Sequence, residues 1–490
     1  MKINWKIGFA ALMAVLAVVL LTCCGAPTLE IDYVRSSESI SETTPAPTET
    51  NGEAESSQTE NKQQTAPAET AHLLHLPKSY DLVVGDTFEL FYKGILLCKD
   101  PYAYNIRVTC PIGKAWGRKF EVTPREAGTY TLAVEICDDG GRLIDKGSTT
   151  LTVKEKSGSP ETLTNVLCIG DSLTEGGAWV GEFYRRLTAT DAQTAFGDPA
   201  PIGDGRRQIA FVGSKTTANG AGYEGYGGWT LDTYLSTAAS TSNYWVEVGA
   251  HTKTDNDQES IYRDASGTKW QLETVEDTRV RLKRYSGTGT LAASGTLTHV
   301  SGGLDVSDMV YTSATPEAKS PFVSDGAVDF SSYCDALGIS TIHRCYILLG
   351  WNSVGSSESS YKAKVRELVD HLIAFNPDIR IALMGLQIPS LDGCANNYGA
   401  TGVYADFRAL QEWVFQLNRW YEELAVEKPD NVTFVNVAGQ FDTENSMMTS
   451  RVAVHARSGE TVTVQSNGLH PAKEGYYQIA DAAYRHFNNH

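Results

Sequence analysis

From residue 160 to the C-terminus, short apolar runs alternate with amphipathic stretches of helical period. Parallel strands need a long crossover between them, so this alternation predicts a three-layer α/β/α domain with a mainly parallel sheet. The clearest helix signal is at 361–375, where apolar residues recur on one face and Asn376-Pro377 ends the pattern. The expected strands are 165–169, 379–386 and 432–437, and the expected helices are 361–375, 404–425 and 472–487. The predicted fold class is α/β.

One part of this region interrupts the alternation. Within residues 244–302, segments such as 269–273 and 279–283 show the period of two that is typical of strands. Turn signals at Ser266-Gly267 and at 286–289 separate them. We therefore expect a β-rich insertion of about sixty residues inside the α/β domain. It can cover the site, bind part of a polymer or simply elaborate the surface.

A second β-rich region precedes the α/β domain. Residues 130–136 alternate apolar with small or polar side chains, and the turn at 138–141 leads into a further strand at 148–153. Residues 73–155 are therefore expected to form a separate β-sandwich. The sequence at 127–130 resembles bacterial Ig-like surface modules. A spacer is its expected role, with weak contact to a glycan as the alternative.

The first residues of the chain have the pattern of an export signal. Lys2 and Lys6 precede an apolar run at 7–21. The run ends in Leu21-Thr22-Cys23-Cys24-Gly25, which resembles a bacterial lipobox. Residues 1–23 are thus expected to be a lipoprotein signal peptide, with Cys24 as the lipidated residue and Cys23 as the second choice. A plain secretory signal is the alternative.

A linker follows the signal. Residues 24–72 are rich in Ser, Thr, Pro and Glu and contain few apolar side chains. Such a segment buries too little apolar surface to offset its ordering entropy, so we expect a disordered tether. Together the two segments predict an exported protein, lipid-anchored to the outer face of a bacterial membrane. The anchor would be its only contact with the membrane.

Charge and composition exclude several classes of function. The chain has 41 Lys and Arg against 59 Asp and Glu, a formal net charge of −18, so it repels polyanions and is not expected to bind nucleic acid. The ten histidines show no metal-binding spacing, and we expect neither a metal nor a cofactor. The nine cysteines form no C-x-x-C pair and are expected to be free thiols, with a Cys98–Cys110 bridge as the alternative.

Four short motifs carry the candidate chemistry. The first follows the strand at 165–169, and ligands of open parallel sheets bind at the carboxyl ends of strands. The motifs are Gly170-Asp171-Ser172-Leu173, Glu224-Gly225-Tyr226-Gly227-Gly228-Trp229-Thr230, Leu349-Gly350-Trp351-Asn352 and Asn467-Gly468-Leu469-His470-Pro471. In type and order they resemble the four blocks of the SGNH (GDSL) hydrolases. The resemblance covers 160–490 apart from the β-rich insertion.

This resemblance implies a role for each matched residue. Ser172 would attack an ester carbonyl, and His470 would take the hydroxyl proton, because an alkoxide is inaccessible at neutral pH. The oxyanion formed by attack needs donors aimed at it in advance. The resemblance assigns these donors to the backbone N–H groups of Ser172 and Gly228 and to the side-chain amide of Asn352.

The substrate is expected to be an acylated carbohydrate or polysaccharide, most simply an acetyl ester. This expectation rests on the carbohydrate esterases within the family, on the tether and on the accessory β-rich regions. Three aromatic residues flank the site residues and can stack on a sugar ring, namely Tyr226, Trp229 and Trp351.

One departure from the family pattern concerns the histidine. Asn467 stands three residues before His470, where the family usually has the Asp of a catalytic triad. An amide oxygen can orient an imidazole but gives the imidazolium no negative charge, and the equivalent change in a serine protease lowers kcat about 10⁴-fold. A Ser–His dyad, a backbone carbonyl, another carboxylate such as Asp442, or an impaired site are the alternatives.

Other functions are compatible with the same motifs. A lipase or lysophospholipase would use them with an apolar acyl groove. A glycan O-acyltransferase would pass the acyl group to a sugar hydroxyl instead of water. A glycan-binding protein with a decayed catalytic site is the alternative from a different class.

Overall fold

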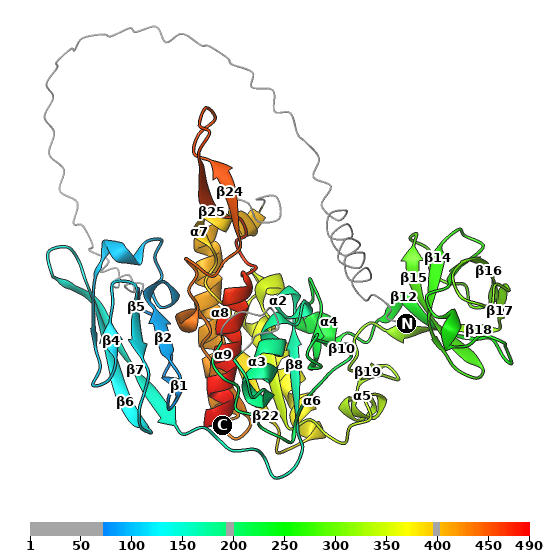
Figure 1. Ribbon diagram of the computed structural model, residues 1–490, viewed down its shortest axis with the longest axis horizontal. Coiled ribbons are helices and arrows are strands. Elements are labelled where there is room, and N and C mark those ends of the chain that lie inside the picture. Colours follow the sequence, from blue (N-terminus) through cyan, green and yellow to red (C-terminus); the bar gives the residue numbers. More distant parts are fainter. Residues whose placement is uncertain (1–71, 193–199, 395–401) are drawn as a thin grey trace, which may run out of the picture. The chain divides into compact units, whose positions relative to one another are not determined.

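The computed structural model describes residues 72–192, 200–394 and 402–490, which belong to one compact unit (Figure 1). The predicted signal peptide, the lipidation candidates Cys23 and Cys24, and the linker up to residue 71 lie outside the described residues. Within the described ranges, no helix combines the length and the apolar character needed to cross a bilayer.

The α/β region contains a parallel sheet in the order β11-β8-β21-β22-β23, with β9 paired to the first half of β8 and the short β10 antiparallel to β11. In chain order this is the 2-1-3-4-5 arrangement of doubly wound sheets, in which the direction of winding changes between β8 and β21. Its strands are β8 (Thr164–Gly170), β9 (Ile209–Val212), β10 (Lys215–Thr216), β11 (Gly222–Gly225), β21 (Arg344–Leu348), β22 (Arg380–Met384) and β23 (Val432–Val435). The α/β class is as predicted.

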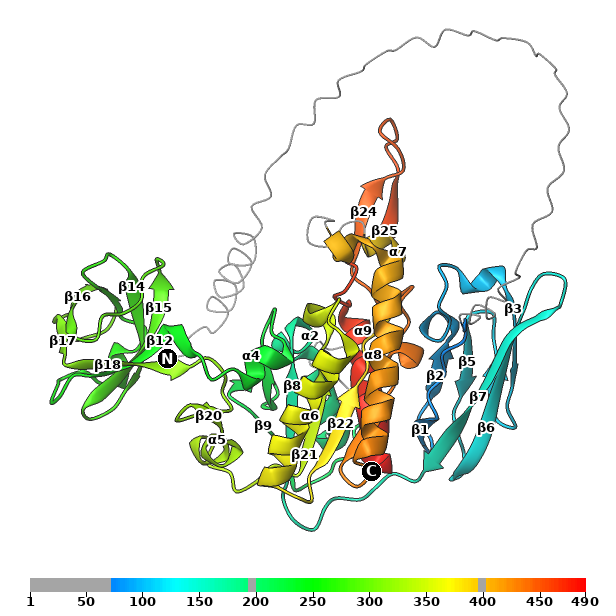
Figure 2. The same cartoon turned by 180° about the vertical axis from the view of Figure 1, so that it is seen from behind.

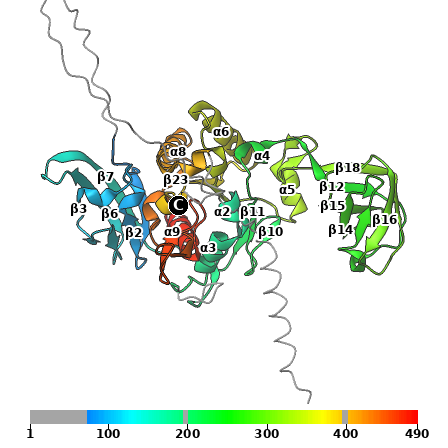
Figure 3. The same ribbon diagram turned by 90° about the horizontal axis from the view of Figure 1, so that it is seen from above.

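Helices cover both faces of this sheet. Seen from above, α6 and α8 lie on one side of it and α3 and α9 on the other (Figure 3), and the front and back views agree (Figures 1 and 2). Helix α6 begins after Ser357, whose hydroxyl caps the backbone N–H of Ser360, and ends before Pro377. The helices of this region are α2 (Ser172–Glu175), α3 (Ala178–Thr188), α4 (Leu231–Leu235), α5 (Phe330–Ala336), α6 (Glu358–Phe375), α7 (Leu391–Cys394), α8 (Phe407–Glu427) and α9 (Lys473–Asn489).

Residues 72–154 form two sheets around one hydrophobic cluster. Buried members of the cluster alternate with more exposed positions along much of β6 and β7, as the period of two predicts. One sheet has the order β1-β7-β6-β3 and the other β2-β5-β4. The strands are β1 (Ser79–Val83), β2 (Phe88–Phe91), β3 (Asn105–Thr109), β4 (Lys114–Ala115), β5 (Lys119–Val122), β6 (Gly128–Cys137) and β7 (Leu143–Lys154). The Ig-like assignment stays a prediction. Cys98 and Cys110 are free thiols.

This N-terminal region contacts the α/β region through buried charges, which differs from the separate module expected from the sequence. The carboxylate of Asp86 is hydrogen bonded to Arg186 of α3 and to Arg485 of α9, and all three side chains are buried. Arg186 is also paired with Asp481 of α9. Long-range ion pairs of this kind leave no periodic signal in the sequence, so the contact was not predictable from it.

The β-rich insertion is longer than predicted. It extends over residues 239–318, beyond the expected 244–302 at both ends, and forms one seven-stranded sheet in the order β17-β16-β13-β14-β15-β12-β18. The strands are β12 (Ala239–Glu247), β13 (Ile261–Arg263), β14 (Lys269–Val275), β15 (Arg279–Ser286), β16 (Gly295–Ser301), β17 (Met309–Tyr311) and β18 (Ser313–Ala318). Its own cluster of apolar side chains includes Trp270, Val246 and Leu282.

Two hairpins were not expected. One is short and pairs β19 (Val323–Ser324) with β20 (Ala327–Val328). The other pairs β24 (Thr449–Ala453) with β25 (Thr461–Gln465) and projects beyond the three layers (Figures 1 and 2). Every side chain of β24 is exposed, so this strand has no alternating burial to read from the sequence.

The buried charges provide a test of the contact between the two regions. Replacing Asp86→Asn should lower the free energy of unfolding by about 3–5 kcal/mol, because it leaves the buried Arg485 without a counter-charge and Arg186 with Asp481 alone. Urea unfolding followed by circular dichroism measures the loss. Glu276→Gln is the control, since it removes an exposed partner of Arg279 and should change the stability by about 0.5 kcal/mol or less. Equal effects of the two substitutions would contradict the buried contact.

Candidate functional site

Ser172 lies at the carboxyl end of β8, on the first turn of α2. Its Oγ is 2.9 Å from Nε2 of His470, and both residues are partly exposed. The close turn depends on Gly170, because a Cβ at that position would lie 1.9 Å from Oγ1 of Thr174. The structure therefore brings the predicted nucleophile and the predicted base into hydrogen-bond contact from positions 298 residues apart.

Asp171 fixes the turn that carries the serine. It is fully buried, and its Oδ1 accepts the backbone N–H of Leu173 at 3.0 Å. Burial raises the pKa of this carboxyl to about 7, although the N–H groups of Leu173 and Gly350 oppose the shift. Its other oxygen, Oδ2, is buried without a hydrogen-bond partner among the described residues. The sequence analysis gave Asp171 no role of its own.

His470 is carried by a turn just before α9. The side-chain oxygen of Asn467 accepts the backbone N–H groups of Leu469 and His470, each at 2.9 Å. Asn467 thus closes the turn that presents the imidazole, a use that needs an oxygen acceptor but no charge. Burial lowers the pKa of His470, and the Glu175 carboxylate partly offsets this effect.

The second and third motifs meet the first beside Ser172. The backbone N–H of Tyr226 donates to the carbonyl of Gly170 at 3.2 Å, and Nδ2 of Asn352 donates to the carbonyl of Trp229 at 3.1 Å. An amide nitrogen carries two protons, so Asn352 retains a second donor. Gly228 has φ +77°, which favours glycine, and no atom lies within 4 Å of the position of a Cβ. The space in front of its backbone is open.

The three aromatic candidates lie in different environments. Trp351 is 2% exposed and its indole contacts Gln387, so it is a core residue and offers no face for a sugar. Tyr226 and Trp229 are partly exposed and stack with ring centroids 4.1 Å apart. The hydroxyl of Tyr226 donates to the buried Glu224. That carboxylate also accepts hydrogen bonds from Ser214 and Tyr333, which hold the pair of rings in place.

Gln387 connects the third and fourth motifs, and the sequence analysis missed it. It is fully buried three residues after β22. Its Oε1 is 3.4 Å from the indole nitrogen of Trp351, and its Nε2 donates to the carbonyl of Leu469, the residue before His470. A polar residue at the carboxyl end of a predicted parallel strand was the signal that could have identified it.

Asp442, the alternative carboxylate for the triad, has other partners. Its Oδ1 accepts from the Arg118 guanidinium at 2.7 Å, and its Oδ2 accepts from the side chain of Asn445 at 2.9 Å. Both oxygens are thus engaged in the contact with the N-terminal region and in a local turn. The structure gives no support to Asp442 as the partner of His470.

One cluster of potential metal ligands occurs among the described residues, formed by Asp81, His486 and His490. The two ring nitrogens of His486 lie 3.1 Å from the hydroxyl of Tyr346 and 2.6 Å from that of Thr433. Burial strongly lowers the pKa of His486. Because hydroxyl groups engage both of its ring nitrogens, the cluster lacks a free ligand atom at its centre.

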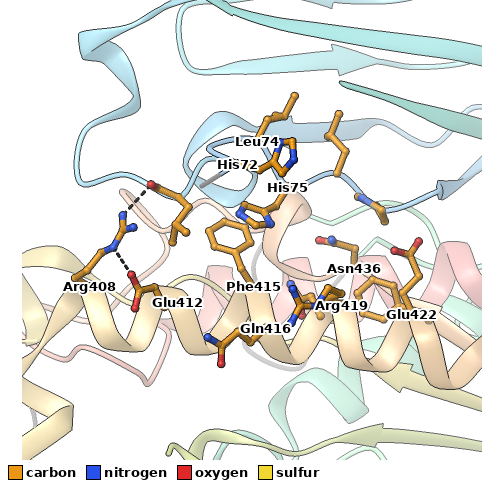
Figure 4. A pocket seen from close by; sticks show the side chains of 15 residues that line it. His72, Leu74, His75, Arg408, Glu412, Phe415, Gln416, Arg419, Glu422 and Asn436 are labelled. Carbon is orange, nitrogen blue, oxygen red and sulfur yellow. Dashed lines mark hydrogen bonds and ion pairs between the residues drawn. The ribbon is translucent and has the colours of Figure 1, made fainter. Parts of the chain in front are cut away.

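A cavity of about 540 Å³ lies between residues 72–77 and helix α8 (Figure 4). The ring of His75 stacks on Phe415 with centroids 4.5 Å apart, and burial lowers the pKa of His75. Arg408 is hydrogen bonded to Glu412 at its rim. The cavity shares no residue with the four motifs.

No protein-family model and no curated protein matches the chain. Solved structures that resemble it include the Clostridium thermocellum family 3 carbohydrate esterase, which is 13% identical over 66% of this chain and 94% of that one, with a TM-score of 0.29. A family 3 carbohydrate esterase from Talaromyces cellulolyticus is 12% identical over 66% and 96%, with a TM-score of 0.30. A carbohydrate acetylesterase family member from Sinorhizobium meliloti is 12% identical over 66% and 97%, with a TM-score of 0.28. The sequence identities and TM-scores are too low for these structures to indicate the function of this chain.

The electrostatics of His470 predict the pH dependence of any reaction that uses it as a base. The base acts as the neutral imidazole, so a lowered pKa moves the acidic limb of kcat/KM below the usual histidine value of about 6.5. Removing the Glu175 charge removes the group that raises this pKa, and Glu175→Gln should move the limb to still lower pH. The pH profile of kcat/KM for a p-nitrophenyl ester measures the shift. Glu460→Gln, on the exposed hairpin, should leave the profile unchanged, and a shift of the Glu175→Gln profile to higher pH would contradict the assignment.

Proposed function

We propose that the protein is a serine esterase that hydrolyses acyl esters of a carbohydrate, with acetyl esters as the simplest substrates. The observation that carries the esterase proposal is the 2.9 Å contact between Ser172 Oγ and His470 Nε2 at the carboxyl end of β8. The order of the four motifs and their hydrogen-bonded convergence support it. The carbohydrate part is supported by the family that the motifs resemble and by the aromatic pair Tyr226 and Trp229 beside the site.

The proposed reaction has two stages, acylation of Ser172 and hydrolysis of the acyl-serine. Ser172 Oγ attacks the carbonyl carbon of the ester while its proton passes to Nε2 of His470. The backbone N–H groups of Ser172 and Gly228 and the amide of Asn352 donate to the oxyanion. Collapse of the tetrahedral intermediate breaks the C–O bond, and the leaving sugar oxygen takes the proton from the imidazolium. Water then attacks the acyl-serine with His470 again as base, and the acid and free Ser172 are released.

Substitutions at these positions test the esterase. Ser172→Ala and His470→Ala should each lower kcat/KM for p-nitrophenyl acetate by roughly 10⁴-fold or more, because they remove the nucleophile or its base. Asn352→Ala should lower it by about 10²–10³-fold through loss of one oxyanion donor. Ser331→Ala, an exposed serine on α5, is the control. Full activity of Ser172→Ala would rule out the proposed nucleophile.

The same assay separates the remaining functions. Turnover that rises along the series from p-nitrophenyl acetate to palmitate would indicate a lipase. Acylated sugar formed in place of free acid would indicate an acyltransferase. Binding of a glycan without turnover of any acylated glycan would indicate a decayed site.

Asn467→Asp tests whether a negative charge is missing behind the histidine. An Asp would keep the two backbone hydrogen bonds that Asn467 makes and add a charge close to His470. It should raise the pKa of the imidazole by about one unit or more, moving the acidic limb of kcat/KM to higher pH. The pH profile gives the shift, and kcat on its plateau shows whether charge also speeds the reaction. An unchanged profile would mean that the charge at residue 467 does not act on His470.

A further inference from the structure

The segments that connect the β-rich insertion to the α/β region contact residues beside the candidate active site. Its two connecting segments are joined where the N–H of Lys319 donates to the carbonyl of Ala238. The buried hydroxyl of Ser320 then donates to the backbone carbonyl of Tyr234 on α4. The ring of Tyr234 packs on Trp229 with centroids 4.9 Å apart, and its hydroxyl lies 2.7 Å from the carbonyl of Gly170. The insertion is therefore anchored to the loop that carries Gly228.

The sheet of the insertion has one face turned away from its apolar core. Trp245 of β12 stands in register with Arg281 of β15 and with Thr315 of β18, and cross-strand partners share a face. Tyr285 lies four residues beyond Arg281 on β15, at a shift in the register with β14, and is 61% exposed. The guanidinium of Arg279 lies 4.4 Å from the centroid of the Trp245 ring. We call this surface the Trp245 face; it comprises Asn243, Trp245, Gln271, Arg281, Lys283, Tyr285 and Thr315.

A basic group of the insertion's stem lies beside the candidate active site. The ammonium group of Lys319 is 5.9 Å from the centroid of the Trp229 ring. The positive charge of Arg281 opposes the rise in the pKa of the Tyr226 phenol that burial and the Glu224 carboxylate cause. The partly exposed Trp229 ring, next to Gly228, thus has a basic group from the stem of the insertion as a neighbour.

The charges on the Trp245 face are balanced. Arg281 is paired with Glu317 and with Glu273, and Lys283 also contacts Glu273. Around these pairs lie two aromatic rings and the side-chain amides of Asn243 and Gln271. Such a surface suits a neutral sugar chain, whose C–H faces stack on aromatic rings and whose hydroxyls bond to amides and ion pairs. It offers no excess charge for a polyanion.

We propose that the Trp245 face binds an extended neutral polysaccharide whose ester groups reach Ser172. This inference rests on the proposed esterase function and names its substrate class as a polymer rather than a small acylated sugar. Trp245 and Tyr285 are the stacking platforms. Their backbone positions differ by four residues along a strand, roughly 13 Å, a separation that several sugar units would span.

Binding is tested first, without turnover. The Ser172→Ala protein is run by affinity electrophoresis in gels that contain acetylated xylan, acetylated glucomannan or heparin. We expect retardation by at least one neutral polymer, and a Kd for it that is about tenfold higher after adding either Trp245→Ala or Tyr285→Ala. Trp116→Ala is the matched control, because Trp116 is a 46%-exposed tryptophan of the N-terminal region that also has a basic group, Lys114, over its ring. It should leave the Kd unchanged.

Turnover gives the second reading. In the protein that retains Ser172, Trp245→Ala should lower the ratio of kcat/KM for the acetylated polymer to kcat/KM for p-nitrophenyl acetate by about tenfold. Retardation by heparin alone, retardation by no polymer, or loss of retardation in Trp116→Ala but not in the Trp245 and Tyr285 variants would each overturn the proposal. Since the electrophoresis uses an inactive variant, its failure is distinct from a failure of the esterase assay.

Discussion

Strands β8 and β21 lie side by side and parallel, and the chain leaves their carboxyl ends in opposite winding directions. That divergence opens the one edge of the sheet where loops from both halves of the domain can meet around a ligand. Ser172 follows β8 and Asn352 follows β21, so the proposed nucleophile and one proposed oxyanion donor come from neighbouring strand ends. The buried carboxyl of Asp171 fixes the turn after β8 by accepting the backbone N–H of Leu173.

His470 reaches this edge from the far end of the chain, so its position depends on how α9 is held. Helix α9 begins three residues after His470 and packs against α3. Arg186 of α3 and Arg485 of α9 share the buried carboxylate of Asp86. The N-terminal region therefore does more than extend the chain, because it supplies the counter-charge for both helices that cover one face of the sheet. Burial alone would raise the pKa of Asp86, but the two guanidinium groups have the larger effect and lower it. The stabilisation that the charged carboxylate gives is therefore present above the ordinary Asp pKa and is lost on acidification.

Much of the α/β region could be predicted from the sequence, because its strands and helices have strong periods. Helix α6 was expected at 361–375 and is found at Glu358–Phe375. The motif residues could also be placed in one site, since parallel topology collects strand ends. The limits of the insertion could not be read, because β18 carries little apolar alternation. Gln387 was missed because its role is to contact two loops that are distant in the sequence, and a single glutamine forms no recognisable motif.

Asn467 shows that the turn before His470 can be closed by a side chain that carries no charge. In this chain its oxygen closes the turn before His470 by accepting two backbone N–H groups, and an Asp could do the same. The substitution therefore removes charge and spares geometry. Burial lowers the pKa of the imidazole, and the exposed Glu175 carboxylate acts in the opposite direction. In the proposed reaction, such a base would stay neutral in mildly acidic surroundings, at the expense of weaker stabilisation of the imidazolium that forms when Ser172 gives up its proton.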